Sequence, residues 1–319
     1  TSSQDYQWEG FYTAAPETKS RVVTVNGGYI KGGANYRAND NSNFFFNVGQ
    51  IMRPPSFDGV FPNADYDFEE ADEILNESFT SFELGYGFRS SNFKGTINAY
   101  HTVWGDRTLR RSTSIDDQGV RIIYSGVEQT HQGIEGEMTW YPSSRLRVKG
   151  MFSLGDWKYT KNFQGDAYFI DNNQPAGTTG TLYLDGVKIG DAAQTVLYLG
   201  FDYKLTSKLS VDLDMMSYDN LHGRFGPLDS EFNSANNRGS IKLPSWGTAD
   251  LGATYSFSLL GYDARARLNV NNLFDEEYLS QSQTNFHNDG GRTWNGINVE
   301  NNVYFGKGTT WNLGLNINF

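Results

Sequence analysis

Apolar and polar residues alternate strictly in many segments of this chain, and this alternation limits the possible fold more than any other feature. The last nine residues, WNLGLNINF, carry an apolar side chain at every second position from Trp311 to Phe319, with asparagine or glycine between them. Successive side chains of a β-strand point to opposite faces, so the pattern predicts a strand between an apolar and a polar medium. We therefore expect an all-β fold.

About eleven segments share this character, and no long segment has a helical period. The predicted strands are residues 21–36, 43–52, 77–88, 93–110, 127–140, 146–160, 193–205, 208–220, 246–258, 262–272 and 308–319. In residues 197–205 and 262–270 the polar face carries charge, so we expect that face to be wet. No run approaches the roughly 18 consecutive apolar residues of a transmembrane helix, whereas a barrel strand needs only about 9–11 alternating residues.

The connections between these strands alternate between short and long. The short ones are residues 37–42, 89–92, 141–144, 206–208 and 259–261, and the long ones are about 53–76, 111–126, 161–192, 221–245 and 273–307. Outer-membrane barrels have this asymmetry, because their periplasmic turns are short and their extracellular loops are long. The connections therefore predict an antiparallel transmembrane β-barrel.

Aromatic residues beside the short turns support the same prediction, because aromatic rings favour the membrane–water interface. They are Phe88, Trp140, Tyr141, Tyr203, Tyr255, Phe257, Tyr262 and Phe319. An ordinary β-sandwich also uses alternating aromatic residues and is the alternative fold.

Composition argues against several classes of function. The net charge is −11, which disfavours nucleic acid as a partner, since phosphate binding needs a basic face. The chain has no cysteine, so it has no disulfide and no thiolate metal site. Residues 65–73 are acidic but lack the spacing of a calcium loop. No nucleophilic constellation is recognisable, so we predict neither an enzyme nor a cofactor or metal site.

The odd number of predicted strands is a problem for a closed barrel, because single-chain barrels have an even number. Residues 5–12 also alternate and could supply one more strand to a closed 12-stranded barrel. The other interpretation is that residues 1–319 form a single, partial barrel domain, the C-terminal half of a 22-stranded barrel.

Four motifs carry a resemblance to a known family. They are NVGQIMRPPSFDGVFPN (47–63), SGVEQTHQGIEGEMTWYP (125–142), LNVNNLFDEEYLS (268–280) and YFGKGTTWNLGLNINF (304–319). From residue 47 to residue 319 they resemble, in the same order, the C-terminal barrel segments of TonB-dependent outer-membrane receptors. The resemblance implies a bacterial outer-membrane protein whose plug domain and TonB box are not in this chain. Implied partners are outer-membrane lipid, the upstream plug and barrel half, and the TonB-type energy-transducing complex; a surface lipoprotein or other outer-membrane subunits are further candidates.

The function that this resemblance implies is ligand-gated, energy-coupled uptake of a scarce solute. Iron chelates, haem, cobalamin, glycans and peptides are all compatible with it. A closed 12-stranded barrel acting as a passive pore or an outer-membrane hydrolase is one alternative. A receptor or structural subunit of an outer-membrane complex is another.

Aromatic and histidine side chains in the predicted outer loops are the candidates for contact with a solute. Aromatic rings can stack on it, and the two histidines could bind a metal chelate or haem, although the same residues could instead pack loop against loop. These candidates are Phe61, Tyr66, Trp104, His222, Phe225, Phe286, His287 and Trp294. Arg53 ends a predicted strand before two prolines. It is the candidate for a residue that faces the lumen and the plug, and the alternative is a solvated strand end.

Overall fold

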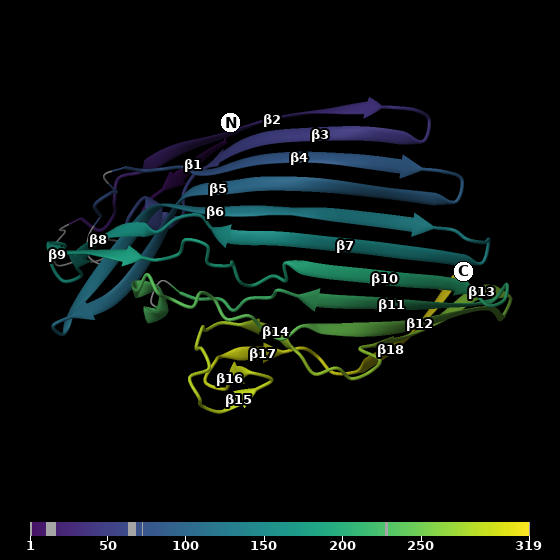
Figure 1. Cartoon of the computed structure of the whole chain (residues 1–319). Coiled ribbons are helices and arrows are strands. Elements are labelled where there is room, and N and C mark those ends of the chain that lie inside the picture. Colours follow the sequence, from purple (N-terminus) through teal and green to yellow (C-terminus); the bar gives the residue numbers. More distant parts are fainter. Residues whose placement is uncertain (1, 11–16, 63–67, 72, 227–228, 319) are drawn as a thin grey trace.

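The computed structural model describes residues 2–10, 17–62, 68–71, 73–226 and 229–318. One antiparallel sheet runs through the molecule, with its strands side by side in chain order (Figure 1). Its main path is formed by β1 (Ser2–Tyr6), β2 (Val23–Arg37), β3 (Ser42–Arg53), β4 (Glu77–Arg89), β5 (Phe93–Ile115), β6 (Gln118–Trp140), β7 (Leu146–Tyr159), β10 (Thr195–Lys204), β11 (Leu209–Asp219), β12 (Trp246–Leu259), β13 (Tyr262–Asn271) and β18 (Thr310–Asn318). The eleven strands from β2 to β18 correspond to the eleven predicted ones, so the predicted strand content is confirmed.

Smaller elements lie in the long connections. They are the strands β8 (Phe163–Phe169), β9 (Pro175–Leu182), β14 (Leu279–Ser282), β15 (Thr293–Trp294), β16 (Ile297–Asn298) and β17 (Val303–Phe305), and the short 3₁₀ helices η1 (Phe57–Gly59) and η2 (Ser230–Asn233). β8 pairs with β6 and β9, whereas β14 with β17 and β15 with β16 form two small separate sheets. Within the described parts of the chain, no helix has the length and hydropathy needed to cross a membrane.

The prediction of a loop over residues 111–126 is wrong. β5 and β6 continue through this segment and are joined by the two-residue turn Asp116–Asp117. Both turn residues have positive φ, 51° and 63°, as the tightest hairpin turns require. Aspartate tolerates this conformation better than most residues, so the two strands can run on without a longer loop.

Strand register aligns the apolar residues on one face of the sheet. Phe201 pairs with Leu213, Leu213 with Leu251, Leu251 with Val270, and Val270 with Trp311. Large apolar side chains exposed on this face extend from β2 to β18, among them Ile30, Phe46, Leu84, Ile134, Leu199, Leu268 and Leu315. A soluble protein does not expose an apolar band of this extent, so the face is suited to contact with lipid.

The two ends of the sheet differ as the connection lengths predict. In Figure 1 the tight turns lie at the right-hand end, and most of the long connections, with β8 and β9, lie towards the left. β18 runs towards the end with the tight turns and finishes there at Asn318. The long connections therefore form a separate layer beyond one end of the barrel wall.

Both outermost long strands have an edge without a neighbour among the described residues. From Gly28 to Arg37, β2 pairs only with β3, and β18 pairs only with β13. Of the segment proposed as a twelfth strand, residues 5–12, the described part (5–10) supplies the end of β1, which pairs with the beginning of β2 rather than with β18, and residues 11–12 lie outside the described residues. The sheet is therefore a partial barrel and not a closed 12-stranded one.

Candidate functional site

The face opposite the apolar band carries charged side chains arranged in ion pairs. The Arg147 guanidinium lies 2.8 Å from the Asp202 carboxylate. The Lys149 ammonium bridges two strands, at 3.5 Å from Asp202 and 3.0 Å from Asp214. These side chains are half-buried or exposed, as expected for groups that line a water-filled lumen.

The charges continue along the same face towards β13. Arg267 donates two hydrogen bonds to Asp212, at 2.8 and 2.9 Å, which is the bidentate arrangement of a strong arginine–carboxylate pair. On β6, Glu135 accepts a hydrogen bond of 3.1 Å from the Ser153 hydroxyl. The wet face predicted from the charged alternate residues of these strands is therefore present, and we call it the luminal face.

Arg53 lies at the outer rim of the luminal face. It forms an ion pair with Glu77, whose side chain is buried. The Trp104 indole donates a hydrogen bond of 3.2 Å to the same carboxylate and stacks on Phe79, with ring centroids 5.0 Å apart. Trp104 therefore belongs to a strand of the barrel wall, β5, and not to a loop. Arg53 forms its ion pair from the luminal face of β3, and its contact with a plug stays a prediction.

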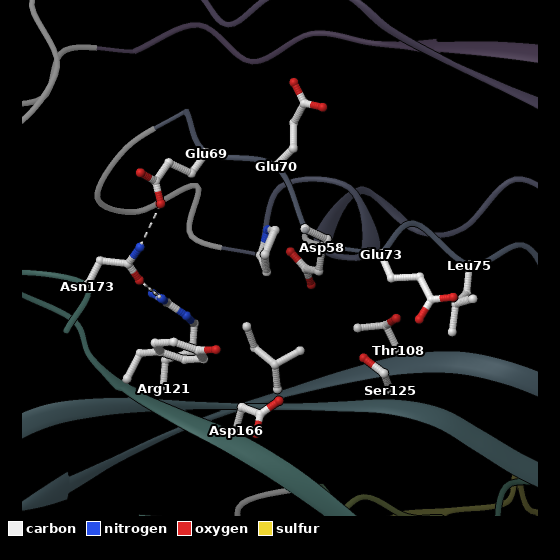
Figure 2. A pocket seen from close by; sticks show the side chains of 15 residues that line it. Asp58, Glu69, Glu70, Glu73, Leu75, Thr108, Arg121, Ser125, Asp166 and Asn173 are labelled. Carbon is white, nitrogen blue, oxygen red and sulfur yellow. Dashed lines mark hydrogen bonds between the residues drawn. The ribbon is translucent and has the colours of Figure 1, made fainter. Parts of the chain in front are cut away.

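A cavity of about 320 Å³ lies among the outer connections (Figure 2). It is enclosed by the connection after β3, the β5–β6 hairpin and β8, and its charged lining residues are Asp58, Glu69, Glu70, Glu73, Asp166 and Arg121. Arg121 is almost fully buried and donates a hydrogen bond of 2.8 Å to Asn173, which in turn donates one of 3.1 Å to Glu69. Sequence reasoning missed Arg121, although a single charge within the apolar run GVRIIY was a usable signal.

Two of the predicted solute contacts, Phe61 and Phe225, are packed inside the loop layer. Phe61 is fully buried in a cluster with Tyr6 and Val60. Phe225 lies against Phe232, with centroids 4.2 Å apart, and the same ring is 5.8 Å from Tyr159. Phe61 therefore offers no surface to a solute in this structure, and its ring holds the outer connections together.

Trp294 has a similar place in the connection between β13 and β18. It packs on the cluster that contains Leu279 and meets Phe305 edge to face, with centroids 5.1 Å apart. Phe286 differs, because about half of its surface is exposed. Phe286 thus keeps the surface that contact with a solute requires, and Tyr66 lies outside the described residues.

The two loop histidines are both anchored to one short segment of backbone. Nδ1 of His222 lies 3.3 Å from the Ser240 carbonyl oxygen, and Nε2 of His287 lies 3.0 Å from the Gly239 carbonyl oxygen. Burial lowers the pKa of His222 and favours its neutral form. In the described portion of the chain, no group of three or more histidine, aspartate or glutamate side chains is placed to hold a metal ion. The geometry ties each histidine to loop packing.

Arg238 forms ion pairs with two outer connections, and the stability of their contact depends on pH. It pairs with Glu231 at 2.9 Å and with Asp289 at 2.5 Å. Hydrogen bonding from Arg238 lowers the pKa of Glu231 below its ordinary value. Because the pKa of Glu231 is lower in the folded protein than in the unfolded chain, the stabilisation by this ion pair is present above the ordinary glutamate pKa of about 4.3. It is lost as the pH falls through the folded pKa.

We expect the backbone amides of residues 229–239 to lose protection from hydrogen exchange on acidification, after correction for the intrinsic pH dependence of exchange. Arg238→Gln should already have low protection at neutral pH, and an unchanged acid response in this variant would contradict the assignment.

Comparisons with known proteins agree with this geometry. A model of the TonB-dependent receptor-like β-barrel family matches residues 6–273. Similar solved structures include the siderophore receptor PiuA from Acinetobacter baumannii, with 14% identity, a TM-score of 0.62, and coverage of 93% of this chain and 36% of that one. BauA, the ferric preacinetobactin receptor from the same organism, has 18% identity, a TM-score of 0.61, and coverage of 95% and 37%. The copper transporter OprC has 13% identity, a TM-score of 0.57, and coverage of 94% and 40%.

The chain therefore spans at most about two fifths of the length of these three proteins. At these identities the likeness establishes the fold alone. Comparison with curated protein sequences gives no match. The family match, the register of the sheet and its two open edges together show that this chain belongs to the TonB-dependent receptor β-barrel family and forms part of such a barrel.

Proposed function

We propose that the chain is the C-terminal half of an outer-membrane receptor barrel that imports a scarce solute with energy from a TonB-type complex. The observation that carries this proposal is the partial barrel itself, with a lipid-suited outer face, a charged luminal face and two edges that have no neighbour in the described part of the chain. An upstream barrel half would pair with β2 and β18, and residues 1–319 would form one domain with it. The siderophore receptors and the copper transporter among similar structures support metals or metal chelates as the first solutes to test.

The mechanism that fits this architecture requires no covalent chemistry. Outer connections capture the solute, and a plug inside the barrel moves when it is pulled from the periplasm. The charged luminal face, with Lys149 between Asp202 and Asp214, then provides a hydrated path for a polar solute. The apolar face keeps the wall in the bacterial outer membrane, with lipid as its partner on that side.

Uptake by the full-length receptor tests this function. The gene, including the region that encodes any upstream plug, is expressed in Gram-negative cells that lack their own receptors for the solutes tested. We expect accumulation of a radiolabelled metal or metal chelate that depends on the receptor and stops when TonB is deleted. Accumulation that continues without TonB would indicate a passive pore, and an upstream region without a plug would contradict energy coupling.

A role as a receptor or structural subunit of an outer-membrane complex is the second candidate. The long outer connections provide a surface for such partners, including a surface lipoprotein. Purification from native outer membrane separates the two functions, because a stable subunit would bring its partners with it in fixed proportion.

A further inference from the structure

A β-bulge interrupts the hairpin of β5 and β6 at the outer rim of the luminal face. Trp104 pairs with Gln129, and the next pair joins Arg107 to Val127, so residues 105–106 stand opposite a single residue of β6. In a regular strand, positions 104 and 107 would point to opposite faces. The extra residue cancels this alternation and brings Arg107 to the face that carries Trp104.

The contact between these two side chains confirms the effect of the bulge. The Arg107 guanidinium carbon lies 3.9 Å from the centroid of the Trp104 ring. Trp104 is also stacked on Phe79, which pairs with it across β4 and β5. A guanidinium over an indole keeps its in-plane N–H donors available for a carboxylate or phosphate. Arg107 also forms a side-chain hydrogen bond with Tyr159, which occupies part of the guanidinium. The stack thus holds Arg107 in place, and its remaining N–H donors are able to bind.

Arg107 differs from Arg53, which lies at the same rim, in its surroundings of charge. Arg53 is neutralised by Glu77. Among the residues that the structure describes, no carboxylate lies within ion-pair distance of Arg107. The nearby Asp106 carboxylate accepts a hydrogen bond of 2.7 Å from Ser78 and forms no ion pair with Arg107. In a chain of net charge −11, an unmatched guanidinium on the luminal face is suited to attract an anionic group.

We propose that Arg107 is a specificity-determining residue that binds a pair of negatively charged oxygen atoms on the imported solute. Carboxylate, phosphate and catecholate groups all provide this chemistry. Trp104 is a positioning residue that fixes the guanidinium plane. The inference rests on the proposed uptake function and narrows its solute class to anions.

Direct binding to the purified full-length receptor tests the proposal. The probes are an anionic iron(III) tricatecholate, haemin with its two carboxylates, and a neutral iron(III) trihydroxamate, each titrated by quenching of tryptophan fluorescence. We expect an anionic probe to bind to the wild type. Arg107→Gln should lower the affinity for that probe about tenfold or more, because charge-assisted bidentate pairs are strong. Arg107→Lys keeps the charge but not the planar fork and should restore the affinity only in part. Arg145→Gln, which removes an exposed charge at the tight turn between β6 and β7, at the opposite end of the sheet from the outer connections, is the matched control and should bind like the wild type.

Heat-modifiable mobility in electrophoresis verifies that each variant has folded. Anion binding that is unchanged in Arg107→Gln, binding of the neutral probe alone, or binding of none of the probes would each overturn the assignment. TonB-dependent uptake of any solute would leave the proposed function intact in all three cases. Loss of TonB-dependent uptake in the wild type would refute the function itself, so the two failures are distinguishable.

Discussion

Replacement of Leu251 by arginine is expected to destabilise the folded barrel by about 2–4 kcal/mol, the cost of a basic residue on the lipid face near the bilayer midplane. Leu251 lies on β12 between Leu213 and Val270, and its side chain is exposed on the apolar face. An arginine there must either leave water or deform the surrounding lipid. Reversible unfolding of the full-length receptor in lipid vesicles, followed in urea, measures the difference in free energy.

Thr248→Arg on the same strand is the matched control. Three positions separate Thr248 from Leu251, so its side chain points to the opposite, luminal face, where it neighbours Met216. The added charge stays in water there, and we expect a much smaller change in unfolding free energy. Equal destabilisation by both substitutions would show that the two faces of β12 have been assigned wrongly.

The 319-residue chain refolded by itself in detergent is expected to yield no sealed, heat-modifiable barrel. Among the residues that the structure describes, neither the outer edge of β2 over residues 28–37 nor the outer edge of β18 has a strand partner for its backbone groups. Each such group costs several kcal/mol in an apolar medium, where no water can replace the missing partner. Open edges of this length also favour association between chains.

Refolding together with the upstream barrel half that we propose, supplied as a separate polypeptide, is the decisive comparison. We expect the mixture to recover heat-modifiable mobility and resistance to protease, because the two missing ladders can then form. A stable, ion-conducting barrel from the isolated chain would instead restore the closed-pore alternative.

The barrel wall could be predicted because its signal is local. Alternation in Leu197–Leu205 or Tyr262–Val270 requires no knowledge of other strands, and the register of β10 to β13 then places their apolar residues on one face. The wrong prediction at residues 111–126 has a local cause as well. Its first part, residues 111–117, is polar except for Ile115 and ends in two aspartates, which suggests a loop, although residues 111–115 pair with residues 118–122 of β6.

The site was less predictable, because it depends on contacts between distant segments. The sequence does not show that Phe61 is buried by Tyr6, or that His222 and His287 meet neighbouring carbonyl groups. It does not show the bulge at residues 105–106 either, and therefore cannot show that Arg107 and Trp104 share a face. Such features arise from pairing register, which a single sequence constrains weakly.

The length of the β5–β6 hairpin has a mechanical consequence. Each strand has 23 residues, whereas about 9–11 suffice to cross the membrane, so much of the hairpin projects beyond the bilayer as a stiff arm. Its hydrogen-bonded ladder is irregular only between residues 104 and 109. A force on the turn at Asp116–Asp117 would therefore bend the hairpin at this irregular part of the ladder, where Arg107 lies over Trp104. Movement of the turn would then change the orientation of the Arg107 guanidinium.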